Sequence, residues 1–203
     1  MNVFFLASAA AVAAARHCDV HVVKMILETC QLLYATYEDD ADVVFTVQPY
    51  RVTHRKHPMA LWAKAARSHW LWLLRLGEAL LTEYTSRTSK VHACSPHFRQ
   101  FRALGPPPSL PATASPKDWP GPASTLLATS GLPPGIEYAP VCLGEHTQAL
   151  KRDEAGNIHL TKTYRQYYKL KPATFKKKKF TWYKKPYPVR ADGSLSFSSV
   201  NTS

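Results

Sequence analysis

The chain has 203 residues, of which 45% are apolar and 20% charged, and its formal net charge is +12. This length and composition suit one globular domain with a hydrophobic core and exclude a wholly disordered chain. The charge is uneven, because residues 151–190 carry 13 Lys and Arg against two acids, whereas the rest is nearly neutral. Such a basic cluster favours a polyanion as partner, either nucleic acid or an anionic membrane surface.

The start of the chain and the cysteines bear on the cellular compartment. Residues 1–15 are apolar like a signal peptide, yet they lack basic residues at the start and run directly into a patterned helix. We therefore expect an intracellular protein rather than a secreted one, and no other segment is long and apolar enough to span a bilayer. The four cysteines form no Cys-x-x-Cys pair, so a structural zinc site of the usual spacing is not expected.

Three helices are predicted along the chain. A short buried extended segment at 2–6 precedes a first helix over 9–37, for which Ser8 is a plausible N-cap. Residues 43–48 are predicted to be a loop with some strand character. Pro58 suits the first turn of a second helix over 59–87, whose bulky apolar residues recur at helical spacing. A third helix is predicted near 160–170. The fold class is therefore mainly α, as a single compact helical domain of about three helices.

The composition divides this domain into four parts. Residues 1–94 form the first part of the helical core, and residues 95–140 form a proline-rich insertion with the composition of a disordered loop. Residues 141–190 form the second part of the core and include a basic aromatic segment. Residues 191–203 have the composition of a flexible tail.

Polar residues of the first helix fall on one narrow line. At about 100° per residue, His17, His21, Lys24, Glu28 and Gln31 lie within roughly 80° of one another on an otherwise apolar helix. We interpret this line as facing a cleft, because titratable groups that converge in a pocket are typical of a functional site. The alternative is a half-exposed helix on which Lys24 and Glu28 make a minor surface pair.

The chemistry that this line could support is covalent or metal-dependent. An amine beside a carboxylate suits a Schiff-base glycosylase/lyase, in which the amine attacks a sugar and the carboxylate moves protons. Alternatively, His17 and His21 could bind a divalent metal ion. Glu28 would lie about 10 Å beyond His21 along the helix, and the ammonium of Lys24 would repel a cation. We therefore predict neither a metal nor another cofactor.

Basic and aromatic residues elsewhere predict contacts with nucleic acid. Lysines neutralise phosphates, and aromatic faces stack on bases. The loop at 50–58 is basic, and the run at 176–190 alternates lysines with aromatic residues. The predicted nucleic-acid-binding residues are Arg51, Arg55, Lys56, Lys176, Lys177, Lys178, Lys179, Trp182, Tyr183 and Lys184.

Several segments together resemble known proteins. The segments MNVFFL, AAARHCDVHVVKMILETCQLL, HRKHPMALWAKAARSHWLWLLRLGEALLTEY and TYRQYY, with a terminal Trp, resemble uncharacterised proteins of phages and large DNA viruses. More distantly, the layout is similar to the pyrimidine-dimer DNA glycosylase/AP lyase family of the endonuclease V type. Members are small and helical, hold the N-terminus against a helix with a catalytic glutamate, and end in a basic aromatic segment, here Trp182-Tyr183-Lys184. The resemblance covers residues 1–90 and 155–190.

The resemblance implies a DNA-repair enzyme that acts on pyrimidine-dimer-like or abasic double-stranded DNA. Glu28 would be the acid/base, the α-amine of Met1 (or Lys24) the nucleophile, and His17 and His21 would line the pocket. Members use the amine exposed after removal of the initiator Met, whereas Asn2 here is usually too large for that removal. We expect a monomer in the cytoplasm or nucleus of a virus-infected cell. Two alternatives stay open: a non-catalytic viral nucleic-acid-binding protein, and a metal-dependent hydrolase that uses the two histidines.

Overall fold

A computed structural model of the chain describes residues 2–170. The predictions made for Met1, Lys176, Lys177, Lys178, Lys179, Trp182, Tyr183, Lys184 and the tail therefore lie outside the described residues.

The described part is mainly helical, as predicted. It contains six α-helices, two single-turn 3-10 helices and one antiparallel pair of two-residue strands. In chain order these are α1 (Ala10–Ala15), α2 (Asp19–Thr36), α3 (Pro58–Ala65), α4 (Arg67–Thr88), α5 (Ser95–Leu104), η1 (Pro116–Asp118), β1 (Leu127–Ala128), β2 (Ala139–Pro140), η2 (Thr147–Ala149) and α6 (Leu160–Leu170).

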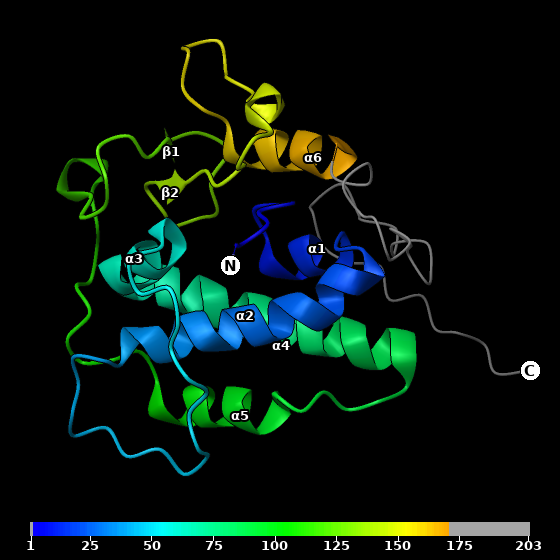
Figure 1. The fold of residues 1–203 in the computed structure, drawn as a ribbon, viewed down its shortest axis with the longest axis vertical. Coiled ribbons are helices and arrows are strands. Elements are labelled where there is room, and N and C mark those ends of the chain that lie inside the picture. The colour runs from blue at the N-terminus through cyan, green and yellow to red at the C-terminus, as the bar shows by residue number, and fades with distance from the viewer. Residues whose placement is uncertain (1, 171–203) are drawn as a thin grey trace, which may run out of the picture.

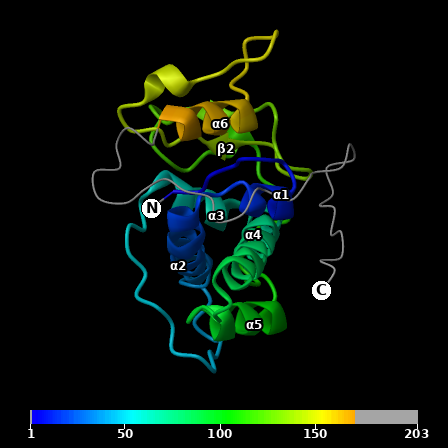
Figure 2. The same cartoon turned by 90° about the vertical axis from the view of Figure 1, so that its right-hand side faces the viewer.

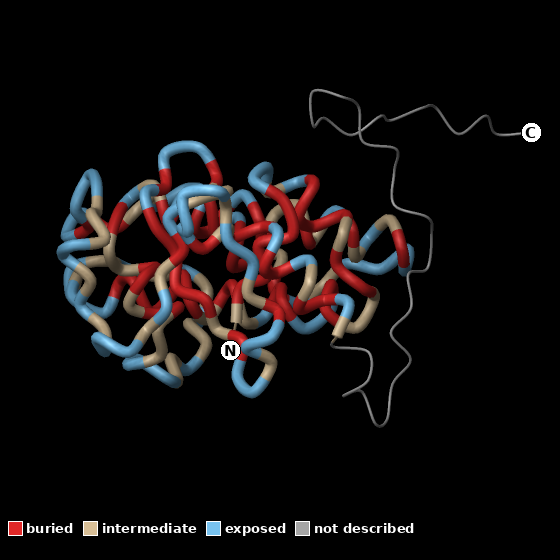
Figure 3. Tube along the Cα trace, turned by 90° about the horizontal axis from the view of Figure 1, so that it is seen from above, coloured by how far each residue is buried: buried red, intermediate tan, exposed pale blue. Residues whose placement is uncertain are grey.

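Helix α4 lies at the centre of the arrangement. It packs against α1, α2, α3 and α5, while α5 lies on the side of α4 away from α6 (Figures 1 and 2). Helix α6 covers the opposite end of the molecule, next to the small sheet and the N-terminal segment. Buried residues run through the middle of the molecule and exposed ones lie mainly in its loops (Figure 3).

The prediction of about three helices is wrong, because two predicted helices are each divided and α5 forms where no helix was predicted. The first breaks between Ala15 and Asp19, where the side chain of Arg87 binds the carbonyls of Ala15 and His17. The second breaks at Ala66, whose backbone is extended at φ −160° and ψ 154°. No Pro or Gly marks either break, so the local signals of a helix end are missing. Contacts with distant residues stabilise the breaks, whereas the third helix forms where it was predicted.

The proline-rich range contains ordered structure. Its first residues form α5, which buries Phe98 and Phe101, and Leu110, Ile136 and Tyr138 are also buried. Residues 43–48, which were predicted to be a loop with some strand character, form a loop without a strand in the structure. The chain there follows the surface of α5, with Thr46 and Val47 both bonded to the side chain of Gln100.

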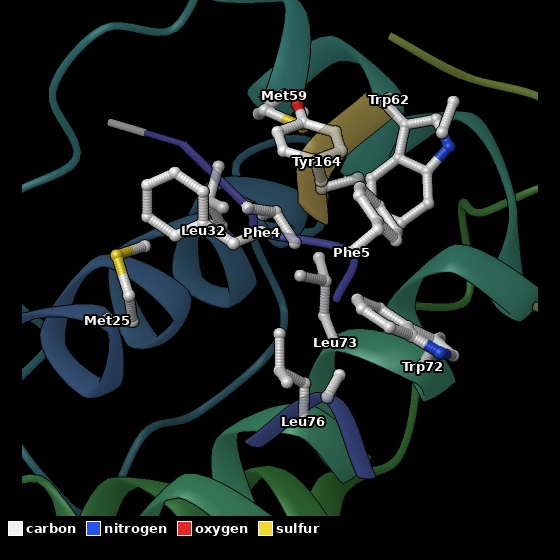
Figure 4. Packing of buried hydrophobic residues seen from close by; sticks show 14 of the residues in the cluster. Phe4, Phe5, Met25, Leu32, Met59, Trp62, Trp72, Leu73, Leu76 and Tyr164 are labelled. Carbon is white, nitrogen blue, oxygen red and sulfur yellow. The ribbon is translucent and has the colours of Figure 1, made fainter. Parts of the chain in front are cut away.

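The N-terminal segment is part of the core. Residues 3–7 are all buried, and Phe4 and Phe5 extend into the space between α2, α3, α4 and α6 (Figure 4). The ring of Phe5 stacks on Trp72 with centroids 4.6 Å apart and meets Trp62 edge-on at 5.4 Å. Burying each such side chain stabilises the fold by about 1.5–3 kcal/mol. The beginning of the chain is therefore fixed against the helix that carries Glu28.

Candidate functional site

Asn2 holds the chain start against two helices and a loop. Its backbone N–H donates to Oε2 of Glu28 over 2.9 Å, and its side-chain amide donates to the carbonyl of Cys142 over 2.8 Å. Its Oδ1 accepts from the N–H of Val3 at 2.8 Å and from the hydroxyl of Tyr164 at 3.2 Å. These bonds fix the first peptide units of the chain beside the carboxylate on α2.

Glu28 and Lys24 form an ion pair in the middle of α2. Their charged atoms are 3.2 Å apart, and the side chain of Glu28 is 13% exposed whereas that of Lys24 is 66% exposed. A lysine that forms a Schiff base must lose its proton first, which burial favours and a neighbouring carboxylate opposes. The ammonium of Lys24 therefore lies in an ion pair at the surface and not in a buried pocket.

His17 and His21 lie in the core and not in a surface cleft, so the interpretation of these residues as one line facing a cleft is wrong for the two histidines. His17 precedes α2, and its Nδ1–H donates to the carbonyl of Ala13 over 2.7 Å. Burial lowers the pKa of His17 to about 4, so that the ring is neutral at pH 7. His21 stacks on Phe4 with centroids 4.7 Å apart, and its Nδ1 is hydrogen-bonded to the hydroxyl of Tyr168.

The two histidines form no metal site with other described residues. Within residues 2–170, no three His, Cys, Asp or Glu side chains are grouped so that they could hold a metal ion. The Nδ1 atoms of His17 and His21 are both engaged in hydrogen bonds with the protein. The alternative of a metal-dependent hydrolase therefore has no supporting site in this part of the chain.

The predicted basic loop borders an open hollow of about 900 Å³. Arg51, Arg55 and Lys56 contribute to its rim, and its walls are aromatic, from Tyr34, Tyr37, Phe45 and Tyr50. Arg55 makes an ion pair with Glu38, whereas the side chains of Arg51 and Lys56 reach solvent. The loop turns through His54, which has a positive φ of 57°, an unfavourable conformation for a residue other than Gly. Arg51, Arg55 and Lys56 thus border one hollow, and Glu28 is not among the residues that line it.

A second hollow adjoins Cys142, whose carbonyl accepts a hydrogen bond from the side chain of Asn2. It has a volume of about 390 Å³, and His57, Cys142 and the loop around Gly144 contribute to its lining. His57 caps α3 by accepting the N–H of Met59 on its Nδ1, and burial is the main cause that lowers its pKa below 6.5. A neutral imidazole in this position keeps its other ring nitrogen as a donor.

Sequence reasoning did not identify Asn2 (as a contact of Glu28), His57, Cys142 or Tyr164 as parts of this site. They come from four separate segments, and Asn2 lies 162 residues before Tyr164. No spacing in the sequence relates such residues. The only available signal was the resemblance, which implied that the chain start lies against the helix with the glutamate.

Comparison with known proteins gives no relative for this chain. No family model, no curated protein and no solved structure matches it. Within residues 2–170, none of the helices combines the length and the apolar character that crossing a membrane requires.

Proposed function

We propose that the protein is a DNA glycosylase/AP lyase that acts on damaged DNA, either pyrimidine-dimer-like or abasic. The observation that carries the proposal is the 2.9 Å hydrogen bond from the backbone N–H of Asn2 to Glu28. The α-amine of Met1 is one peptide unit from this N–H along the chain. An amine and a carboxylate near each other are the two groups that Schiff-base chemistry at a sugar requires.

The proposed reaction assigns one role to each group. The neutral α-amine attacks C1′ of the damaged nucleotide and displaces the base, which leaves with a proton. Protonation of O4′ then breaks the C1′–O4′ bond and opens the sugar ring, so that C1′ and the nitrogen form a cationic imine. An abasic sugar reacts in its open aldehyde form and loses water instead. Glu28 moves the protons and stabilises the cationic imine. Removal of a proton from C2′ then expels the 3′ phosphate by β-elimination. An α-amine has an ordinary pKa of about 8, against about 10.4 for lysine, so it is more readily neutral at pH 7.

DNA would be held by basic residues on the surface. Arg51 and Lys56 are exposed at the rim of the aromatic hollow, where they can neutralise phosphates. Following the resemblance to viral proteins, we propose a monomer that acts on double-stranded DNA in the cytoplasm or nucleus of an infected cell.

Borohydride trapping tests this proposal. The full chain is mixed with a duplex that contains one abasic site, reduced, and analysed on a denaturing gel. We expect an adduct that maps to Met1 and is strongly reduced in Glu28→Gln, a variant that keeps an acceptor for the N–H of Asn2. The matched control is Glu78→Gln, which removes a carboxylate from the surface pair with Arg102 and should trap normally. An adduct on Lys24 would overturn the assignment of Met1 as the nucleophile. The absence of any adduct would overturn the proposed glycosylase/AP lyase activity.

A second candidate is a nucleic-acid-binding protein without catalysis. It is favoured by the bonding of Glu28, whose carboxylate binds both Lys24 and the backbone of Asn2 as a purely structural ion would. For this candidate, Glu28→Gln should leave DNA affinity unchanged and the wild-type protein should form no adduct.

A further inference from the structure

Helix α6 has two faces of opposite character. Its inner face buries Leu160, Tyr164, Tyr167 and Tyr168 in the core, whereas Lys162, Arg165 and Lys169 are exposed. At about 100° per residue these three cations fall within about 60° of one another, on the side of the helix opposite Tyr164. The helix contains no acidic residue. Lys162, Arg165 and Lys169 make no ion pair with a carboxylate of residues 2–170.

A fourth cation meets this face at the N-terminal segment. Nη1 of Arg16 donates to the carbonyl of Leu6 over 3.0 Å, and Nε of Arg165 donates to the same oxygen over 2.8 Å. The two guanidinium groups are close enough to repel each other. Burial and, next, the charge of Arg165 lower the pKa of Arg16. Like charges that the fold holds this close are stabilised when an anion binds between or beside them.

His159, the residue just before α6, lies close enough to Lys162 for the charge of that lysine to affect its pKa. Burial is the main cause that lowers the pKa of His159, and the charge of Lys162 is the next. The charge of Arg165 also lowers this pKa and that of Asp153 raises it, so two cations of α6 act on His159 against one carboxylate.

We infer that the outer face of α6, defined by Lys162, Arg165 and Lys169, together with Arg16, binds the phosphodiester backbone of duplex DNA. Lys162 and Lys169 are seven residues apart, or about 10 Å along the helix. Along the duplex axis one strand carries a phosphate about every 3.4 Å, so a helix that lies along this axis spans about three phosphates of one strand. Guanidinium groups add the paired donors that match phosphate oxygens.

The burial of the apolar face of α6 favours nucleic acid over a membrane surface as the partner. A helix that lies on a membrane inserts its apolar face into the lipid. The apolar face of α6 is already buried against the N-terminal segment, where Tyr164 bonds Asn2 and Phe4 contacts Tyr167 and Tyr168. Only the charged face is available to a partner. This inference rests on the DNA-binding part of the proposed function and names a contact surface for it, but it does not require the lyase chemistry.

The test measures the binding of the full chain to an undamaged 20-base-pair duplex over a series of salt concentrations. The variant Lys162→Gln/Arg165→Gln/Lys169→Gln removes the three exposed cations of α6. We expect weaker binding and a slope of log K against log salt that is reduced by about 2.7, because each phosphate contact contributes about 0.9.

The matched control is Lys64→Gln/Arg102→Gln/Lys117→Gln, which removes the same charge at positions where Lys64 and Arg102 already pair with carboxylates. Its slope should stay close to that of the wild-type chain. An equal loss of slope in both variants would show a net-charge effect and overturn the inference, as would an unchanged slope in the α6 variant. The inference would also be overturned if the α6 variant lost binding to anionic vesicles while its binding to DNA stayed intact. Thermal unfolding of both variants checks that the fold is retained.

The two proposals fail in different experiments. A wild-type chain that gives no borohydride adduct, but loses salt slope in the α6 variant, would keep this surface and remove the lyase. An adduct at Met1 with an unchanged slope would keep the lyase and remove this surface.

Discussion

The side chain of Arg87 joins the end of α4 to the turn between α1 and α2. Nη1 donates to the carbonyl of His17 at 2.7 Å and to Oδ1 of Asp19 at 3.1 Å, and Nη2 donates to the carbonyl of Ala15 at 3.0 Å. Nε and Nη2 also bind Oε2 of Glu83 at 2.9 and 2.8 Å. The side chains of Arg87 and Glu83 are only 7% and 10% exposed, so water cannot readily replace these bonds.

Replacing Arg87 by Met should therefore destabilise the fold strongly. The substitution fills similar space but leaves the carboxylate of Glu83 and two helix-end carbonyls without their donor. Removing one member of a buried ion pair costs about 3–5 kcal/mol. The comparison is Arg102→Met, which removes an exposed guanidinium from its pair with Glu78 and should change the stability little, because solvent screens the pair.

Urea denaturation of the two variants provides the measurement. We expect a lower midpoint for Arg87→Met with an unchanged dependence on urea, and almost no shift for Arg102→Met. Adding Glu83→Gln to Arg87→Met should restore part of the stability, because it removes the unpaired charge. The reasoning is refuted if Arg87→Met and Arg102→Met have the same midpoint.

Three further predictions concern the core. Burial lowers the pKa of His17 and His69 to about 4, so between pH 6.5 and 4 the unfolded chain binds protons that the folded chain does not. The free energy of unfolding should therefore fall by about 3 kcal/mol for each histidine as the pH is lowered through this range. Urea midpoints that stay constant over this range would contradict the prediction. Gly77→Ala places a Cβ 2.0 Å from Cε1 of Phe98, so the ring of Phe98 or the helix that carries it must shift, at a cost of about 1–3 kcal/mol. Thermal unfolding measures the loss, which Phe98→Leu in the same chain should partly reverse. Tyr34→Phe removes a hydroxyl with two buried hydrogen-bond partners and should cost about 1–3 kcal/mol in the same assay, whereas an unchanged melting temperature would mean that these bonds contribute little.

The sequence predicted the features that local patterns determine. The mainly helical class and the position of α6 follow from apolar residues at helical spacing, and Pro58 correctly predicted the start of α3. The breaks near His17 and at Ala66 could not be predicted, because distant contacts stabilise them. One of these is the bond from Arg67 N–H to the carbonyl of Pro111.

The candidate site was predictable only in part. Glu28 was chosen because it is the one acid on the polar line of the first helix, and the structure shows that it binds the backbone N–H of Asn2. His17 and His21 share the same line in the sequence, but their environment depends on how Phe4 and Tyr168 pack, and these residues are far apart along the chain. Helical spacing predicts which residues share a face, but not what covers that face.

The burial of the N-terminal segment has a consequence for how the chain is made. Asn2 and Phe4 find their partners on α6 about 160 residues later, so this part of the core cannot close until the whole helical body has been synthesised. At about 5–20 residues per second, Phe4 and Phe5 would wait roughly 10–30 s after leaving the ribosome. During this time two adjacent aromatic side chains are open to chaperones, and α6, the last helix within residues 2–170, completes their packing when it emerges.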